Sequence, residues 1–277
     1  MFHARVALLG AALLAAGLAG GTVWWWQFAS PAAGETDSDL PVPPFPPRIT
    51  EGSTYESCLA ALIDDPDDAI AIAEAWQSNG GGDGAAHCRG LALIALGEPA
   101  QGAGVLEDLA RTTTAPPLAK ASVLYQAAQA RLMVEQDAQA RDDANAALAL
   151  SPDDPDLLIV RATAEAGLGA DAEAVQDLTD ALVHEPTRND ALVARAALFR
   201  KQGRLDAAQD DVRRALVHDP DDPDALLERG ILRQRAGDLA GARDDWEHAR
   251  RASPDSATAD QAEQNLSLLD VGPSKQP

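Results

Sequence analysis

The sequence offers few side chains that could perform chemistry, and the two cysteines, Cys58 and Cys88, are the first to consider. His87 lies next to Cys88, and cysteine together with histidine is a common zinc ligand set. Zinc sites of that kind normally show short spacings such as C-x-x-C or H-x-x-x-H, and the sequence has neither. We therefore expect no metal site.

Two aspartate-rich stretches, 151–156 and 219–224, are the next candidates, because calcium prefers carboxylate oxygens as ligands. An EF-hand loop also needs a central glycine and a closing glutamate, which both stretches lack. Aspartate before a helix commonly accepts hydrogen bonds from the free amides of the first turn. We therefore expect helix caps here and no calcium site.

His184 and His218 occupy equivalent places, before a Glu-Pro and an Asp-Pro pair. A histidine at the end of a helix is favoured by the helix dipole, and a pH-responsive pair is the alternative. No glycine-rich phosphate loop, nucleophile elbow or other catalytic motif is present in the sequence. The sequence thus predicts no enzyme, no cofactor and no small-molecule substrate.

Charge and composition narrow the class of protein further. The 277 residues include 22 basic and 44 acidic side chains, for a net charge of −22. This acidity disfavours nucleic acid, whose phosphates require a basic surface. We interpret it as a solubilising surface, with attraction to a basic partner as the alternative. Aromatic residues make up 4% of the chain and no alternating pattern indicates a strand, so we expect an all-α fold.

A repeat organises the expected helices. Four prolines recur at a constant spacing of 34 residues, each after a similar run of Ala, Leu, Asp and Arg: Pro152, Pro186, Pro220 and Pro254. A fixed period of this length is typical of a solenoid of helical hairpins. The pattern resembles the tetratricopeptide repeat, which implies a right-handed α-solenoid of helix–turn–helix units with a C-terminal capping helix.

The resemblance is strongest where the two helices of one hairpin would touch. Small residues occupy the eighth and twentieth places of the units: Gly90, Ala128, Ala162, Ala196 and Gly230, then Gly102, Ala140, Ala174, Ala208 and Ala242. A bulky side chain there would push the helix axes beyond about 8–10 Å. The usual aromatic of the eleventh place survives as Phe199. The usual apolar residue of the seventh place is arginine in four units: Arg89, Arg161, Arg195 and Arg229.

The domain organisation follows from the repeat. A looser helical hairpin at 54–82 precedes the repeats at 83–256, and a capping helix at 257–270 precedes a disordered tail at 271–277. The five units are 83–116, 121–154, 155–188, 189–222 and 223–256. Four residues are inserted after the first unit. The capping helix would cover the last apolar face of the solenoid.

The start of the chain predicts a membrane anchor. Residues 1–29 combine Arg5 with an uncharged run that would span about 30 Å as a helix, which matches the core of a bilayer. A Trp triplet at 24–26 would lie at the interface, and the positive-inside rule places the rest of the chain outside the cytoplasm. The proline-rich stretch 30–53 would be an extended linker. We expect a single-pass inner-membrane protein with a periplasmic C-terminal domain; secretion to the periplasm after signal cleavage is the alternative.

The repeat arrangement also bears on the cysteines. Cys58 and Cys88 would lie on the first helices of successive hairpins, and the resemblance implies that such helices lie side by side. In an oxidising compartment a disulfide closing a loop of about 30 residues would contribute about 3–4 kcal/mol. Two buried thiols are the alternative.

The resemblance finally implies a partner site, because similar solenoids are peptide-binding scaffolds whose first helices line a concave groove. The family's groove places here give an apolar middle and a basic rim: Tyr125, Gln129, Met133, Ile159, Thr163, Val193, Arg200, Lys201, Leu227, Ile231 and Arg235. Arg204 extends the basic rim. Its cations either complement helix C-termini or bind an acidic or C-terminal carboxylate ligand.

We therefore expect a non-catalytic scaffold that binds proteins or peptides. A chaperone-like holder for a single extracytoplasmic client in envelope or cytochrome assembly is the alternative.

Overall fold

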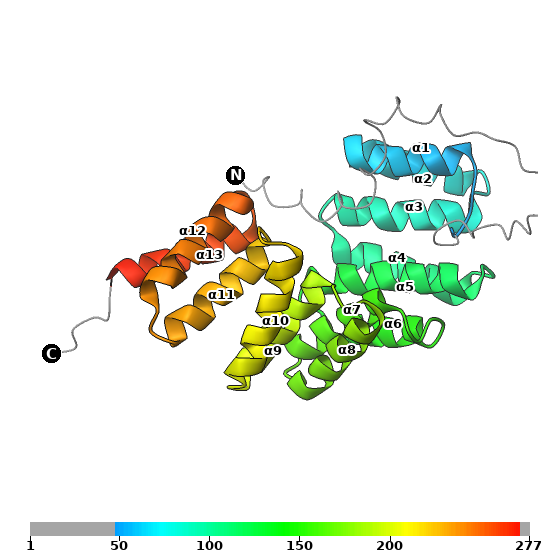
Figure 1. Cartoon of the computed structure of the whole chain (residues 1–277). Helices are drawn as coiled ribbons and strands as arrows, with labels where there is room; N and C mark the ends of the chain where they lie inside the picture. The colour runs from blue at the N-terminus through cyan, green and yellow to red at the C-terminus, as the bar shows by residue number, and fades with distance from the viewer. Residues whose placement is uncertain (1–47, 272–277) are drawn as a thin grey trace, which may run out of the picture.

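The computed structural model describes residues 48–271, and this part of the chain is built from thirteen α-helices (Figure 1). No residue within 48–271 forms a β-strand, so the all-α prediction is confirmed. Helices α1 to α13 span, in order, Ser53–Asp64, Pro66–Ser78, Gly82–Ala95, Pro99–Thr112, Pro117–Leu132, Asp137–Leu148, Pro155–Gly167, Asp171–His184, Asn189–Lys201, Leu205–His218, Pro223–Arg235, Leu239–Ala252 and Ala257–Val271. The predicted anchor and most of the predicted linker and tail lie outside the described residues.

Aspartate and proline determine where several helices begin. Asp65, Asp154, Asp222 and Asp238 each accept a hydrogen bond from a first-turn amide, ahead of α2, α7, α11 and α12. Proline follows the first three of these caps, at a position where its missing amide hydrogen costs no helical hydrogen bond. The aspartate-rich turns therefore cap helices, as the sequence predicts.

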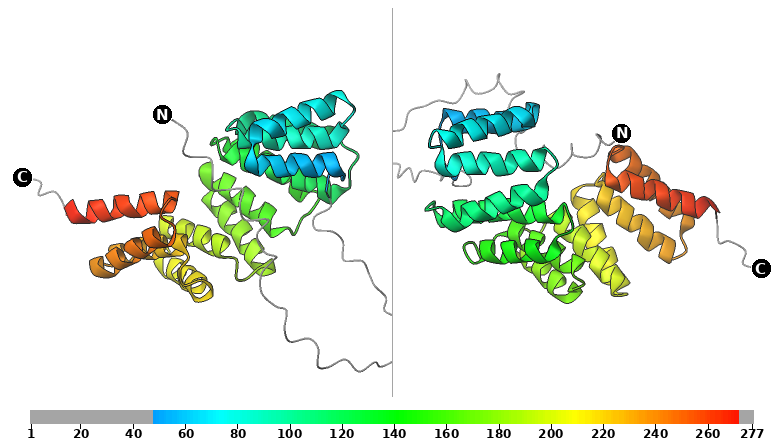
Figure 2. Two further views of the ribbon diagram at one scale, coloured as in Figure 1. Left: turned by 90° about the horizontal axis from the view of Figure 1, so that it is seen from above. Right: turned by 180° about the vertical axis from the view of Figure 1, so that it is seen from behind.

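The helices form consecutive hairpins that stack into a curved row (Figures 1 and 2). Each helix packs on the next, and odd-numbered helices also contact one another across hairpins, as in α5–α7, α7–α9, α9–α11 and α11–α13. The even-numbered helices make no contacts of similar extent with one another within the described residues. The odd-numbered helices thus form the inner, more closely spaced layer of the solenoid, and the even-numbered helices form the outer layer.

The small residues predicted at the hairpin contacts are buried in all five repeats. A β-carbon on Gly102 would lie 2.6 Å from the carbonyl oxygen of Gly90, so this hairpin requires glycine for its close approach. In the last repeat, Gly230 faces the side chain of Trp246, which is fully buried and donates its indole hydrogen to the carbonyl oxygen of Leu227 at 3.2 Å. A small residue opposite a large one keeps the hairpin densely packed.

The second repeat, formed by α5 and α6, departs from the others. Helix α5 has 16 residues whereas α7, α9 and α11 have 13 each. The four inserted residues therefore lengthen α5 by about one turn at its N-terminal end. The turn inside each repeat has positive φ, and glycine supplies it in four of them: Gly97, Gly169, Gly203 and Gly237. The second repeat has Glu135 there, at φ 56°, where a side chain is strained.

Helix α13 closes the C-terminal end of the solenoid. It packs on α11 and α12, and its Ala259, Ala262 and Leu266 are buried. Asp260 and Gln261 are exposed on the same helix. The polar side of α13 thus faces solvent and its apolar side covers the last repeat.

Candidate peptide-binding groove

The predicted groove residues belong to the inner helices α5, α7, α9 and α11 or to the position that follows α5. Five are exposed: Gln129, Met133, Thr163, Lys201 and Arg235. Five are half-buried: Tyr125, Ile159, Val193, Arg200 and Ile231. Because neighbouring inner helices are in contact, these ten side chains form one strip across four helices, which we call the inner strip.

Leu227 is not on the surface of the inner strip. Its side chain is 8% exposed and belongs to the C-terminal core cluster, together with Leu226 and Trp246. On α11 the strip therefore consists of Ile231 and Arg235.

Tyr125 connects the strip to the charged turn between α8 and α9. Its hydroxyl oxygen accepts a hydrogen bond from the amide of Gln129 at 2.9 Å. Burial raises the pKa of Tyr125 to about 12, and Asp156 adds to the shift. Arg188 neutralises this area by ion pairs with Asp156 at 2.6 Å and Asp190 at 3.0 Å. Tyr125 is therefore a neutral hydrogen-bonding group at the edge of the strip.

The basic rim is largely occupied by carboxylates of the chain itself. Arg200 forms an ion pair with Glu228 of α11, whose side chain is 6% exposed. Burial raises the pKa of Glu228, and Arg200 opposes that shift. Lys201 pairs with Asp171 at the start of α8, at 2.7 Å. These two contacts join successive repeats, so both cations contribute to the solenoid itself.

The other two rim cations have no carboxylate within 4.0 Å among residues 48–271. Arg235 is the last residue of α11 and is exposed. Arg204 precedes α10 and lies over the ring of Phe199, with its guanidinium carbon 4.1 Å from the ring centroid. It borders a different hollow from the inner strip.

A set of ion pairs that the sequence analysis did not predict explains the arginines of the seventh place. In each of the last three repeats this arginine binds a buried aspartate on the second helix of its own hairpin: Arg161 with Asp177, Arg195 with Asp211, and Arg229 with Asp245. The three aspartate side chains are 8%, 4% and 4% exposed. Each pair is bidentate, with nitrogen–oxygen distances of 2.6–3.0 Å. The sequence signal was an aspartate at a constant distance after each arginine.

The second repeat has the aspartate without the arginine. Asp143 occupies the equivalent place, but Ala127 stands where the arginine would be. Arg131 is directed to Glu107 of α4 instead, at 2.5 Å, and one carboxylate oxygen of Asp143 is buried without a hydrogen-bond partner. Burial, with Glu107 nearby, raises the pKa of Asp143 to about 7.

Glu165 of α7 is a second carboxyl group with a raised pKa, about 7. Burial is the main cause, and the nearby Asp177 adds to it. Arg161 lowers the pKa, but its guanidinium is already bound to Asp177. The charge balance of the ion-pair rows accounts for the raised pKa.

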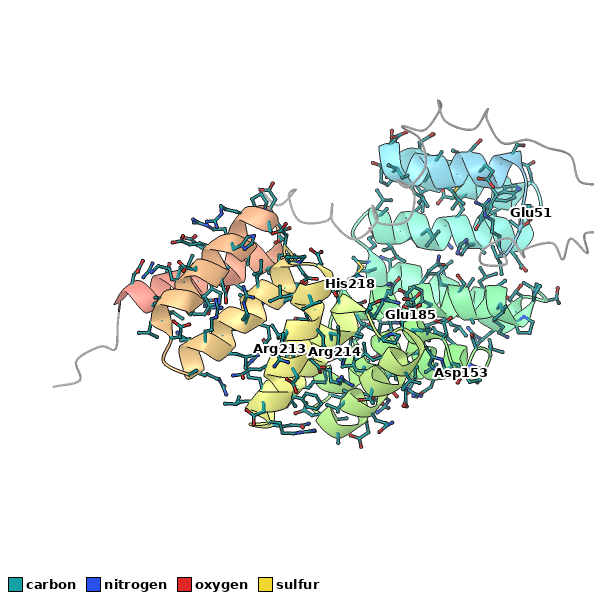
Figure 3. The ribbon with its side chains drawn as sticks, in the orientation of Figure 1. Glu51, Asp153, Glu185, Arg213, Arg214 and His218 are labelled. Atoms are coloured by element: carbon teal, nitrogen blue, oxygen red, sulfur yellow. A yellow bond between two sulfur atoms is a disulfide. The ribbon has the colours of Figure 1, made fainter. Side chains whose placement is uncertain are left out.

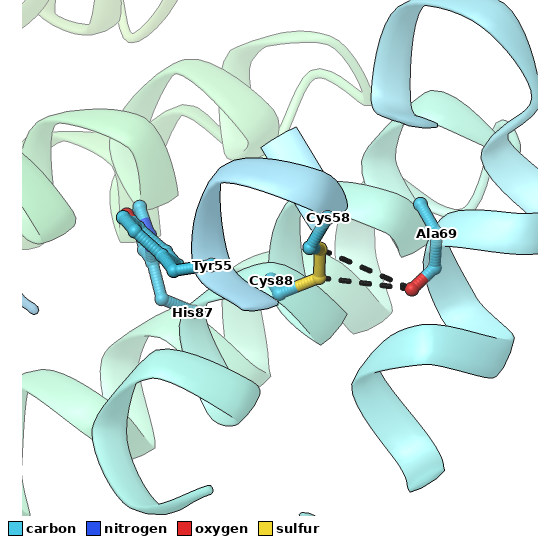
Figure 4. Close-up of a disulfide and its surroundings, with 5 residues drawn as sticks. All are labelled: Tyr55, Cys58, Ala69, His87 and Cys88. Carbon is cyan, nitrogen blue, oxygen red and sulfur yellow. Dashed lines mark hydrogen bonds between the residues drawn. A yellow bond between two sulfur atoms is a disulfide. The ribbon is translucent and has the colours of Figure 1, made fainter. Parts of the chain in front are cut away.

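The two cysteines meet at the N-terminal end of the solenoid. Cys58 of α1 and Cys88 of α3 form a disulfide with a Cα–Cα distance of 6.2 Å, and both sulfurs lie against the carbonyl oxygen of Ala69 (Figure 4). Both residues are fully buried. The disulfide thus joins the opening hairpin to the first repeat.

His87 lies beside the disulfide in a hydrogen-bonded chain (Figure 4). The amide oxygen of Gln126 only accepts, so Nε2 of His87 donates to it at 2.6 Å and Nδ1 accepts from the hydroxyl of Tyr55 at 2.6 Å. Burial lowers the pKa of His87, which keeps the ring neutral as this arrangement requires. The chain links α1, α3 and α5.

His184 and His218 are the last residues of α8 and α10, where the sequence analysis places them (Figure 3 labels His218). His184 lies 4.0 Å from Asp153, whose side chain is exposed. Within residues 48–271, no three His, Cys, Asp or Glu side chains are arranged to hold a metal ion.

Comparisons with known proteins identify the fold. Residues 189–232, which form α9, α10 and most of α11, match the tetratricopeptide repeat family. No curated protein matches the whole sequence significantly. The structure is similar to that of YrrB, a TPR protein with an unusual peptide-binding site, at 18% identity and a TM-score of 0.50, covering 70% of this chain and 97% of YrrB.

Two further solved structures share this arrangement. TTC0263, a thermophilic TPR protein of Thermus thermophilus, is 20% identical with a TM-score of 0.54, covering 67% of this chain and all of that protein. Cut9, from the APC/C hetero-tetramer Cut9–Hcn1, is 14% identical with a TM-score of 0.61, covering 78% of this chain and 42% of the other. The chain therefore has the fold of a tetratricopeptide-repeat solenoid.

Proposed function

We propose that the protein is a non-catalytic scaffold that binds a protein or peptide along the inner strip. The observation that carries the proposal is the continuity of the strip, because α5, α7, α9 and α11 contact one another and present exposed side chains on one layer. YrrB, which has the same fold, is described by its peptide-binding site, and this supports the proposal.

The strip has different chemistry along its length. At α5 and α7 it offers Met133, Ile159 and Thr163, which suit an apolar segment with some hydrogen bonding. At α9 and α11 it offers Lys201 and Arg235, which suit a carboxylate. Arg200 is committed to the buried Glu228, so the carboxylate contact falls to the two exposed cations.

Site-specific photo-cross-linking in cells tests the location of the site. A photoreactive residue at Thr163 should capture a partner, whereas the same residue at Val217, which is 79% exposed on the outer helix α10, should capture little. Equal capture at both positions would contradict the proposal. One dominant captured protein would favour a dedicated client holder, and several would favour a scaffold.

Charge reversal tests the basic end of the strip. Lys201→Glu together with Arg235→Glu should weaken capture at Thr163 by about tenfold, since each charge-assisted hydrogen bond contributes about 1.5–3 kcal/mol. Arg250→Glu with Arg251→Glu, on exposed outer-layer residues of α12, is the matched control. If both double variants behave alike, the basic end does not contact the partner.

We further propose that residues 1–29 anchor the scaffold in the inner membrane, with the solenoid in the periplasm. The support is the uncharged run after Arg5 in the sequence. Among the helices of residues 48–271, none is long and apolar enough to cross a membrane. Carbonate extraction should leave the full-length protein in the membrane pellet, and release of a shortened protein would indicate cleavage instead.

A further inference from the structure

A basic hollow lies between α9 and α10, away from the inner strip. It has a volume of about 470 Å³, and most of its lining comes from the outer helix α10, on which Figure 3 labels Arg213 and Arg214. Its lining residues are Arg195, Phe199, Arg204, Ala207, Asp210, Asp211, Arg213 and Arg214. Four arginines face two aspartates, so the hollow carries an excess of two positive charges.

Most of the arginines in the hollow already have partners. Arg195 forms the bidentate pair with Asp211, and Arg213 pairs with Asp210 at 2.6 Å. Arg214 contacts Asp211 at 3.3 Å and donates to the carbonyl oxygen of Pro186 at 2.9 Å. Arg204 is the exception, since its side chain makes no hydrogen bond or ion pair with any residue of 48–271 and is exposed. Its five N–H donors are available to a ligand.

The ring of Phe199 holds Arg204 in place. The guanidinium carbon of Arg204 lies 4.1 Å from the ring centroid and that of Arg195 lies 5.6 Å from it. Stacking on an aromatic ring fixes the plane of a guanidinium and leaves its edge free to bind a carboxylate with two parallel hydrogen bonds. A preorganised donor loses less conformational entropy on binding than a mobile side chain.

The other repeats show that this arrangement is particular to α9 and α10. The residues equivalent to Phe199 and Arg204 in the second repeat are Arg131 and Gln136, which hydrogen-bond each other at 2.6 Å. In the last repeat they are Arg233 and Asp238, which form an ion pair at 3.8 Å. Both of these cations are satisfied within the chain, whereas Arg204 is not. The fold therefore does not require an unpaired arginine at this place.

We propose that this hollow is a second docking site, for a carboxylate side chain of an acidic peptide segment in a partner protein, with Arg204 as the contact residue. Charge complementarity favours this occupant, although the whole chain has a net charge of −22. At physiological salt the screening length is about 8 Å, so the local excess of arginine governs the interaction once a short acidic segment reaches the hollow. A long polyanion such as nucleic acid would also meet the acidic surface around it.

Fluorescence anisotropy with the full chain tests the proposal. The probe is a fluorescein-labelled eight-residue peptide of Asp, Glu and Ser, and its Asn, Gln and Ser counterpart is the neutral control. The acidic peptide should bind, and Arg204→Ala should weaken its binding by about tenfold or more. Arg204→Lys keeps the charge but loses the planar stack, and should recover only part of the affinity.

Two controls separate this site from the inner strip. Arg251→Ala removes an exposed arginine of α12 and should leave binding of the peptide unchanged. Lys201→Glu with Arg235→Glu should also leave it unchanged, so failure of the inner-strip proposal is distinguishable from failure of this one. The proposal is overturned if Arg204→Ala binds the acidic peptide as the wild type does. It is also overturned if an eight-nucleotide single strand binds more tightly than the peptide.

Discussion

The N-terminal end of the solenoid and its last three repeats are held together by different chemistry. At the N-terminal end, the Cys58–Cys88 disulfide joins α1 to α3, and Tyr55, His87 and Gln126 continue the connection to α5. In the last three repeats, arginine–aspartate pairs join the two helices of each hairpin. An end hairpin has a neighbour on one side only, so a covalent bond compensates for missing packing. An internal hairpin is enclosed on both sides, and there a paired charge can be buried.

The second repeat lies between these two regions and has neither device. Its Asp143 lacks the arginine that the later repeats supply, and Glu135 occupies a turn that elsewhere has glycine. We infer that α5 and α6 form the least stabilised joint of the described solenoid. Four variants break or sharpen this comparison.

Removal of the disulfide should have the largest effect. Cys58→Ser with Cys88→Ser should lower the stability of the N-terminal end by about 3–4 kcal/mol, because the loop of about 30 residues is no longer closed in the unfolded chain. Thermal unfolding with and without reductant measures the change. Reduced wild-type protein should behave like the double variant, and an unchanged melting temperature would show that packing alone holds α1 in place.

Breaking one ion pair should cost somewhat less. Arg161→Ala leaves the buried Asp177 without its cation and should lower stability by about 3 kcal/mol, at the low end for buried pairs because Arg161 is partly exposed. Urea unfolding gives the difference. Replacing both partners with leucine should recover most of it. Arg141→Ala, at an exposed pair with Asp142, is the control and should cost less than about 1 kcal/mol.

Asp143 should make the second repeat sensitive to pH. The pKa of Asp143 is raised from 3.8 to about 7, so between these pH values the folded chain keeps a proton that the unfolded chain has lost. Stability should therefore fall as pH rises from about 4 to about 7. Asp143→Asn should gain about 1–2 kcal/mol at pH 8, a value reduced for solvent screening, and nothing near pH 4. A gain independent of pH would exclude titration of Asp143 as the cause.

The smallest effect is expected at the turn of the second repeat. Glu135→Gly relieves a side chain at positive φ and should raise stability by about 1 kcal/mol, because glycine adopts this conformation without strain. Gly169→Ala makes the reverse change in the third repeat and should lower stability by a similar amount. Differential scanning calorimetry can compare the two; loss of stability in Glu135→Gly would mean that the glutamate makes a useful contact.

The sequence predicted the hairpins and their close contacts because the repeat period places small residues at fixed positions. It did not predict the Arg161–Asp177 pairing, although both residues were visible, because the repeat pattern alone does not show which side chains meet across a hairpin. The contact of Arg200 with Glu228 crosses from one repeat to the next and depends on the stacking geometry. Leu227 occupies a groove place by number, but it belongs to the core beside the large Trp246.

Hydrogen exchange with mass spectrometry, on oxidised and reduced full-length protein, tests the division of the solenoid most directly. Reduction should increase exchange in α1, α2 and α3, with a smaller increase in α5 through the Tyr55–His87–Gln126 chain. Protection of α7 to α12 should not change, because the ion pairs there do not depend on the disulfide. A uniform increase across all the helices would show that the chain is one cooperative unit and would contradict the account.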